Sequence, residues 1–303
     1  MKSNRRSFLK SASLGVAGLG SASLGTIGQG LAGAPSGRVG DVDGRKGIEL
    51  AIATICMDGF GDEDFGPAFE LAPKLGIKNI EFNVWYPRNI TLAGIESIRR
   101  RCYEFGLTPI SLQGTSFGGR VVKDVSHKLW LMEQAKSLGC RRVKFTGAKR
   151  GEAGGLETVI DILKELAPAA EEMDVLVLVE NHANNNIETV EDYDQIFDAI
   201  PSKHIGMCLD MGHFDGAGVN NMEVVGRFHD RILHIDLKDT IEFGRYKTVN
   251  FGEGATDFHG IVSKMVEHAY SGYLVIEQAP PLRTAHLLED LSRAKTLFEK
   301  YEK

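Results

Sequence analysis

Four acidic side chains stand where apolar, strand-like runs of the sequence end. They are Glu180 after residues 175–179, Asp210 after 205–209, Asp236 within 232–237 and Glu277 after 273–276. One such residue alone is usually a solvated strand end or the cap of the next helix. Four carboxylates brought close together repel one another and shift their pKa values unless a cation holds them. We therefore hypothesise that these four residues hold a divalent metal ion.

The strand-like run that holds Asp236 carries more charge than a buried strand usually does. Side chains alternate between the two sides of a strand, so His234, Asp236 and Lys238 are expected on one side. Buried charged groups are unfavourable unless they are paired. A metal and a polar substrate would supply partners. For Lys238, an ion pair with Asp239 or with a carboxylate of a neighbouring strand is an equal alternative.

These side chains need a framework that brings several strand ends together. Apolar runs of strand length alternate with amphipathic helical stretches along the chain. The expected strands are 48–55, 77–84, 107–112, 142–145, 175–179, 205–209, 232–237 and 273–276. The expected helices are 65–75, 91–105, 122–138, 156–172, 189–199, 221–228, 257–269 and 284–301. This alternation favours an α/β fold, a single (β/α)₈ TIM barrel, over an open doubly wound sheet.

In a barrel of this kind the functional site forms at the carboxyl ends of the strands. Polar residues expected there are candidates for substrate contacts: Glu81, Asn83 and Trp85 on the second strand, Lys144 on the fourth, His182 after the fifth and His234 on the seventh. Trp85 equally fits a cap over the core. His182 equally fits a loop residue or a partner of a metal ligand.

Several motifs resemble those of the xylose isomerase-like TIM barrel superfamily, the family of sugar isomerases, sugar epimerases and AP endonuclease 2-type proteins. They are Val179-Glu180-Asn181-His182, Leu209-Asp210-Met211-Gly212-His213, Gly252-Glu253-Gly254 and Gly272-Tyr273-Leu274-Val275-Ile276-Glu277. Each motif alone is weak, whereas together they are specific. The resemblance covers nearly the whole chain after its N-terminal segment and implies a xylose isomerase-like barrel.

The resemblance implies that Glu180, Asp210, Asp236 and Glu277 are the metal ligands. At the seventh strand, epimerases and dehydratases of this superfamily commonly carry His-x-His-x-Lys-Asp, with the second His as ligand. This chain has Asp236 at that position, as xylose isomerases do. Four carboxylates favour Mn²⁺ or Mg²⁺, whereas a histidine ligand would favour Zn²⁺ or Co²⁺. The spacing leaves His213 and His234 open as further ligands.

The resemblance further implies proton abstraction beside a metal-bound carbonyl, through an enediolate. Glu180 and Glu277 would exchange the proton, His213 would polarise a substrate oxygen, and Lys238 would stabilise negative charge. The expected function is a metal-dependent sugar isomerase or epimerase. A carbon–oxygen lyase or hydratase acting on 3-keto-glycosides is the alternative, and a non-catalytic sugar-binding barrel is a second one. An endonuclease-type phosphodiesterase is disfavoured.

The N-terminus resembles a twin-arginine export signal. It combines Arg5-Arg6-Ser7-Phe8-Leu9-Lys10, a small-residue apolar run over 11–27 and Ala32-Gly33-Ala34. We therefore expect a signal peptide at 1–34, a linker at 35–46 and the barrel at 47–303. Its partner would be the twin-arginine export machinery, and the location would be periplasmic or otherwise extracytoplasmic. Signal cleavage and retention as an anchor stay open.

The remaining composition narrows the possible partners. Residues 1–34 hold four basic and no acidic side chains, so the rest of the chain carries 31 Lys and Arg against 41 Asp and Glu. This acidity argues against nucleic acid as a partner, because phosphates require a basic surface. A carbohydrate is the expected partner, and a homo-oligomer is left open. The four cysteines occur singly, so we expect buried thiols without disulfides.

Overall fold

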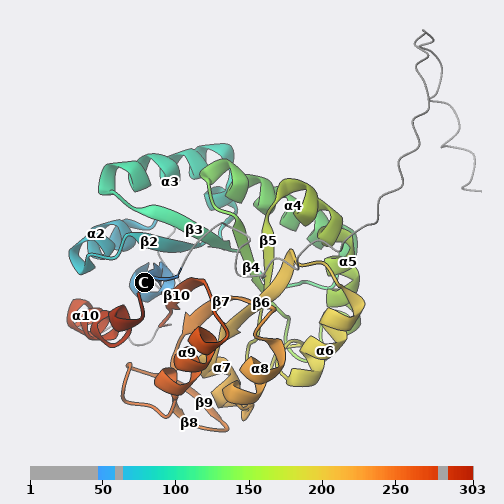
Figure 1. Cartoon of the computed structure of the whole chain (residues 1–303). Coiled ribbons are helices and arrows are strands. Elements are labelled where there is room, and N and C mark those ends of the chain that lie inside the picture. Colours follow the sequence, from blue (N-terminus) through green and yellow to red (C-terminus); the bar gives the residue numbers. More distant parts are fainter. Residues whose placement is uncertain (1–46, 59–63, 279–285, 303) are drawn as a thin grey trace, which may run out of the picture. The chain divides into compact units, whose positions relative to one another are not determined.

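The strands predicted from the sequence form a closed barrel. The computed structural model describes residues 47–58, 64–278 and 286–302. Within them, eight parallel strands pair in the order β1–β10–β7–β6–β5–β4–β3–β2 and back to β1 (Figure 1). They are β1 (Ile48–Ala53), β2 (Asn79–Asn83), β3 (Thr108–Gln113), β4 (Arg142–Thr146), β5 (Leu176–Glu180), β6 (Ile205–Asp210), β7 (Ile232–Leu237) and β10 (Gly272–Ile276). The predicted fold class is confirmed, while the predicted signal peptide (1–34) and linker (35–46) lie outside the described residues.

Helices surround the strands, as Figure 1 shows. They are α1 (Ile55–Asp58), α2 (Gly66–Leu75), α3 (Leu92–Phe105), α4 (Val121–Leu138), α5 (Gly155–Met173), α6 (Val190–Ala199), α7 (Met211–Ala217), α8 (Asn221–Phe228), α9 (Phe258–Glu267) and α10 (Leu287–Phe298), with short 3₁₀ turns η2 (Pro87–Ile90) and η3 (Glu299–Tyr301). Asp257 caps the N-terminus of helix α9, and its side chain accepts a hydrogen bond from the Gly260 N–H at 2.9 Å. No helix in the described ranges is long and apolar enough to cross a bilayer.

Apolar side chains fill the space between the strands and the helices. Val143 and Val177 of adjacent strands belong to the same buried cluster as Leu163 and Leu166 of α5. Strand side chains alternate in direction, so the other half of each strand faces the barrel axis. There, apolar residues form only small clusters, such as Ala51, Ala53, Ile55, Ile110, Tyr273 and Val275. Branched apolar residues usually fill such a barrel, so this interior is unusually polar.

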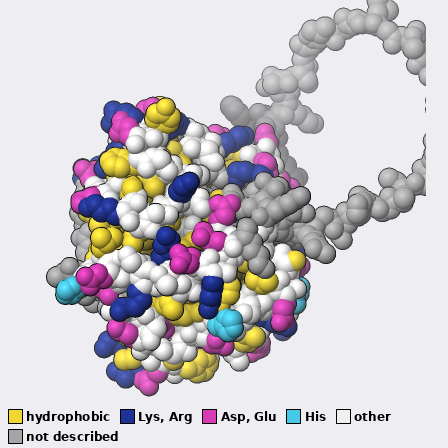
Figure 2. All heavy atoms as spheres, turned by 60° about the vertical axis from the view of Figure 1, so that its left-hand side comes forward, with side chains coloured by type: hydrophobic (Ala, Val, Ile, Leu, Met, Phe, Trp, Pro, Cys, Tyr) yellow, Lys and Arg dark blue, Asp and Glu magenta, His cyan; other side chains and the backbone are white. Residues whose placement is uncertain are grey.

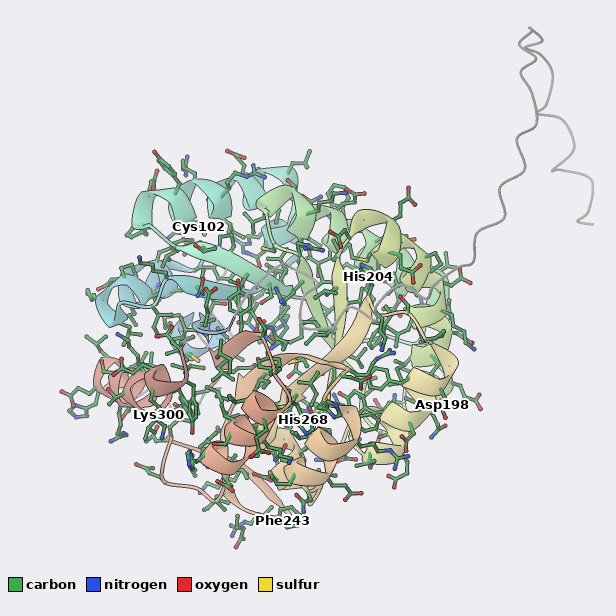
Figure 3. All side chains as sticks on the ribbon, viewed as in Figure 1. Cys102, Asp198, His204, Phe243, His268 and Lys300 are labelled. Atoms are coloured by element: carbon green, nitrogen blue, oxygen red, sulfur yellow. The ribbon has the colours of Figure 1, made fainter. Side chains whose placement is uncertain are left out.

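Two elements next to the carboxyl ends of β6 and β7 were not predicted. Helix α7 follows β6 directly, and a two-stranded antiparallel hairpin, β8 (Asp239–Glu242) and β9 (Arg245–Val249), follows β7. Figure 3 shows Phe243 at the outer end of this hairpin. A Cβ on Gly212 would lie 2.7 Å from the Lys238 carbonyl oxygen, so only glycine lets α7 approach β7 this closely.

The outer surface carries charges of both signs. On the face drawn in Figure 2, Lys and Arg side chains are interspersed with Asp and Glu side chains. The four cysteines are buried free thiols, as predicted. The chemically unusual part of the described structure is therefore the barrel interior.

Candidate metal centre

Ionisable side chains from six strands or their carboxyl ends meet inside the barrel. We call this group the inner cluster: Glu81 (β2), Lys144 (β4), Glu180 (β5), Asp210 (β6), His234, Asp236 and Lys238 (β7 and the residue after it) and Glu277 (after β10). Each is at most 3% exposed. The alternation predicted for 232–238 is therefore observed, because His234, Asp236 and Lys238 all contact members of this cluster.

The pairing register brings the four predicted carboxylate ligands together. Asp210 of β6 stands opposite Asp236 of β7, and β10 pairs with the other side of β7. Glu180, Asp210, Asp236 and Glu277 each offer an oxygen, and these oxygens lie within 4.8 Å of one another. Four buried oxygen donors at this spacing fit a hard divalent cation such as Mn²⁺ or Mg²⁺.

Lys238 pairs with carboxylates of neighbouring strands and not with Asp239. Its Nζ lies 2.5 Å from Asp210 Oδ2 and 3.8 Å from Glu277 Oε2. Asp239 instead accepts hydrogen bonds from the backbone N–H groups of Gly252 and Gly254 at 2.9 and 3.0 Å. The ammonium of Lys238 therefore lies among the candidate metal ligands, while Asp239 fixes the loop that carries the Gly-Glu-Gly motif.

Lys144 lies at the centre of the inner cluster. Its Nζ is 2.5 Å from Asp236 Oδ2 and 2.7 Å from Glu81 Oε1. It is also 3.4 Å from Glu277 Oε2 and 3.8 Å from Glu180 Oε2. Lys144 and Glu81 were predicted to contact substrate, and both side chains are fully buried and paired with each other.

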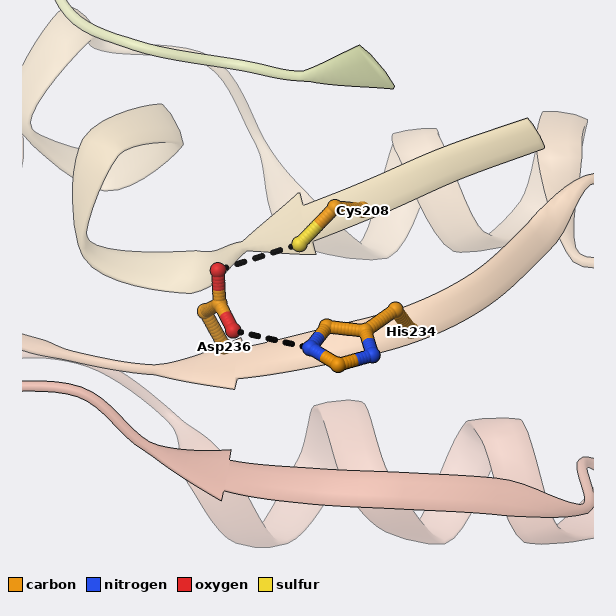
Figure 4. A group of neighbouring side chains, drawn as sticks. All are labelled: Cys208, His234 and Asp236. Carbon is orange, nitrogen blue, oxygen red and sulfur yellow. Dashed lines mark hydrogen bonds and ion pairs between the residues drawn. The ribbon is translucent and has the colours of Figure 1, made fainter. Parts of the chain in front are cut away.

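His234 connects the two carboxylates that flank Lys144. Its Nε2 lies 3.1 Å from Glu81 Oε2 and 3.4 Å from Asp236 Oδ1. Figure 4 shows His234 and Asp236 on the same side of β7, with Cys208 of the adjacent strand β6 donating to Asp236. Asp236 Oδ2 therefore has two donors, the Cys208 thiol at 3.0 Å and the Lys144 ammonium at 2.5 Å.

Burial and neighbouring charges divide the carboxylates into two groups. Burial raises the pKa of Glu180 to about 7 and raises the pKa values of Asp210 and Glu277, although lysines oppose the effect. For Asp236, burial also acts upward, but Lys144 and His234 outweigh it and hold the pKa well below its usual range. Lys144 and His234 likewise keep the pKa of Glu81 low against burial. Protons are therefore held most tightly at Glu180 and Glu277.

Two histidines and a tyrosine stack beside the carboxylates. The ring centroids of His182 and His213 are 3.7 Å apart, and those of His213 and Tyr246 are 4.6 Å apart. The Ala183 N–H donates to His213 Nδ1 at 3.3 Å, so the neutral ring carries its proton on Nε2. Burial, reinforced by Lys238, holds the pKa of His213 well below its usual range. His213 is thus a neutral donor whose Nε2 lies 3.8 Å from Asp210 Oδ2.

The remaining predicted substrate contacts lie on the β1–β3 side of the barrel. Asn83 accepts hydrogen bonds from the Thr54 hydroxyl and the Ile55 N–H, both at 2.8 Å, and donates to Gln113. Gln113 in turn donates to Glu180 Oε2 at 2.9 Å. Trp85 is partly buried and packs against the apolar cluster that contains Ile55. Asn83 therefore supports the residue that orients Glu180.

Sequence reasoning missed three residues of this region. Asn181 bridges β5 and β6, because its side chain bonds both the N–H and the carbonyl of Asp210 at 2.9 and 2.8 Å. Cys208 donates a hydrogen bond to Asp236, and Tyr246 lies on strand β9 of the β8–β9 hairpin. A glycine at 244 between two alternating β-prone segments is a hairpin signal that could have located Tyr246.

Known proteins share this fold. The chain is 25% identical over 160 residues to an inosose dehydratase of Geobacillus kaustophilus (strain HTA426), covering 48% of this chain and 52% of that protein. It thus spans about half the length of this curated relative. The crystal structure of a zinc-bound IolI protein superposes with a TM-score of 0.71 at 21% identity, covering 84% of this chain and 99% of that one. The 3-keto-D-glucoside 4-epimerase YcjR from E. coli superposes with a TM-score of 0.66 at 18% identity, covering 83% and 100%.

A family model for the xylose isomerase-like TIM barrel matches residues 69–294. The match includes seven of the eight barrel strands and the whole inner cluster. The chain therefore belongs to the xylose isomerase-like TIM barrel family.

Proposed function

We propose that this chain is a divalent-metal-dependent sugar isomerase or epimerase. The observation that carries the proposal is the set of four buried carboxylates, Glu180, Asp210, Asp236 and Glu277, with oxygens within 4.8 Å of one another. They would hold one divalent ion, with Mn²⁺ or Mg²⁺ preferred for an oxygen-only set. When bound, the ion would polarise the substrate carbonyl as a Lewis acid, which acidifies the adjacent C–H.

Glu180 and Glu277 would move the proton. They come from strands separated by β6 and β7, so they approach the substrate from different sides. A carboxyl group with a pKa near 7, such as Glu180, is matched to proton transfer at neutral pH. One glutamate would remove the C–H proton and the other would return a proton to the opposite face, which inverts that carbon.

The neighbouring cations and donors would stabilise the charge that develops during proton removal. His213 would donate its Nε2–H to a substrate oxygen, and Lys238 would supply a fixed positive charge. Gln113 would hold Glu180 in place through its 2.9 Å hydrogen bond. Tyr246 and His182 would form the wall against which the substrate lies.

A lyase or hydratase acting on 3-keto-glycosides is the second candidate. Similarity to an inosose dehydratase and to a 3-keto-D-glucoside 4-epimerase supports it. It would begin with the same proton removal, after which the C–O bond to a β-substituent breaks, a C=C bond forms and an acid protonates the leaving oxygen. The export signal proposed for residues 1–34 is consistent with a lyase or hydratase, because exported enzymes meet intact glycosides.

A substrate panel separates these candidates. Free ketoses and 3-keto-glycosides would be incubated with the full chain, with Mn²⁺ or with chelator, in deuterated water. An inverted or isomerised sugar carrying deuterium supports the first proposal, and released aglycone supports the second. Binding without turnover, unchanged in Glu277→Gln, would instead identify a sugar-binding barrel. Full activity after complete metal removal would refute metal dependence.

Export has a test of its own. A reporter protein fused behind residues 1–46 should reach the periplasm, and replacing Arg5 and Arg6 with Lys should retain it in the cytoplasm. Export that survives this replacement would contradict a twin-arginine signal.

A further inference from the structure

Lys144 is placed where a metal ion would compete with it. Its Nζ lies 2.5 Å from Asp236 Oδ2, 3.4 Å from Glu277 Oε2 and 3.8 Å from Glu180 Oε2. These three residues belong to the four-carboxylate set whose spacing fits a cation. The ammonium group therefore uses the same oxygens that a bound divalent ion would need.

Asp236 is the residue for which this competition is direct. Its Oδ2 already has the Lys144 ammonium at 2.5 Å and the Cys208 thiol at 3.0 Å as donors. Its Oδ1 has no hydrogen bond and lies 3.4 Å from His234 Nε2. A metal that binds Asp236 must either use Oδ1 alone or displace Lys144.

The charged groups of the inner cluster also indicate that Lys144 competes with a metal ion. Five carboxyl groups and only two ammonium groups lie within it, so a divalent cation that displaces carboxyl protons finds more carboxylates than the two lysines pair. Like charges inside a protein repel strongly at a separation of about 4 Å. Lys144 therefore opposes the binding of a metal ion among the same carboxylates.

We propose that Lys144 is a positioning residue that shares the carboxylates with the metal, holding Asp236 and lowering the cluster's affinity for divalent cations. This inference rests on the proposed metal-dependent function. It differs from a contact with substrate, because the Lys144 side chain is fully buried, whereas Glu277 and Lys238 retain slight exposure.

A second buried lysine provides a matched control. Lys128 of α4 is also fully buried and lies 3.1 Å from Asp124. Its Nζ sits 4.8 Å from the ring centroids of Phe117 and Phe145, outside the inner cluster. Replacing either lysine with Met removes one buried ammonium group, but only Lys144→Met removes it from the carboxylate set.

The experiment titrates the full chain with Mn²⁺ by calorimetry and needs no substrate. We expect Lys144→Met to bind Mn²⁺ at least about tenfold more tightly than the wild type, which corresponds to about 1.4 kcal/mol. Lys128→Met should keep the wild-type affinity. Equal or weaker binding by Lys144→Met would overturn the inference.

A second pair of variants tests the effect of Lys144 on Mn²⁺ affinity if Lys144→Met does not fold. Asp236→Asn leaves Lys144 without its closest partner and should weaken Mn²⁺ binding by at least about tenfold. Adding Lys144→Met to Asp236→Asn restores the balance of charge and should recover most of the loss. An identical affinity for the single and double variants would overturn the inference.

The outcomes also separate this inference from the proposed function. If the wild type binds Mn²⁺ and substitution of Lys144 changes nothing, only the role of Lys144 is refuted. If neither the wild type nor any variant binds Mn²⁺, the metal-dependent function and the inference both fail. Binding by Lys144→Met alone would support the inference and contradict metal dependence of the natural chain.

Discussion

Replacing Glu180 with Gln should stabilise the metal-free protein, and the gain should grow as the pH rises. Glu180 is 1% exposed, and its Oε2 accepts a hydrogen bond from Gln113 at 2.9 Å. Glutamine has almost the same size and offers an equivalent carbonyl acceptor, but it carries no charge. The substitution therefore removes a buried charge while it preserves the local packing.

The expected magnitude follows from the pKa of Glu180, which burial raises from the ordinary value of 4.5 to about 7. The folded protein binds this proton more tightly than the unfolded chain does, so stability is lost as the pH rises from 4.5 toward 7. The full difference corresponds to about 3 kcal/mol. Between about pH 5 and about pH 8, the advantage of the variant should grow by about 2.5 kcal/mol.

Urea denaturation in the presence of chelator measures this advantage at each pH. Both proteins contain the same histidines, including His182 and His213, whose pKa values are lowered mainly by burial. Their contributions to the pH dependence therefore cancel in the difference between the two proteins. At high pH, adding Mn²⁺ should make the wild type more stable than Glu180→Gln, because the ion stabilises only the protein that binds it.

A pH-independent difference would refute the reasoning. It would mean that Glu180 stays ionised throughout, as expected if a lysine outweighed its burial. A variant less stable than the wild type at both ends of the pH range would show that the carboxylate is needed for packing.

Three further outcomes are expected. Glu277→Gln should lower kcat at least about 100-fold, measured on whichever substrate the panel identifies; a loss below about tenfold would exclude a role in proton transfer. Mn²⁺ at about 100 times its Kd should raise the free energy of unfolding by about 2.7 kcal/mol in denaturant titrations, and an unchanged midpoint would argue against a native metal site. Asp257→Ala should lower the free energy of unfolding by about 1 kcal/mol without affecting Mn²⁺ affinity, because Asp257 only caps α9; altered Mn²⁺ binding would contradict that purely structural role.

The sequence alone predicted the alternating strands and helices, and hence the barrel. Strands such as 176–180 and 205–210 are continuous apolar runs ended by a carboxylate, and several helices end at a glycine such as Gly76 or Gly106. These are local signals, since periodicity and caps depend on neighbouring residues only. The same periodicity correctly placed His234, Asp236 and Lys238 on one side of β7.

The tertiary structure decided which charges meet. Lys144 on β4 pairs with Asp236 on β7 and Glu81 on β2, strands that are not its neighbours in the sheet. Periodicity shows that each side chain faces the axis, but the closure of the barrel and the register of its strands set which ones lie at the same height. The sequence therefore identified the carboxylates of the candidate metal centre, and only the fold placed Lys144 among them.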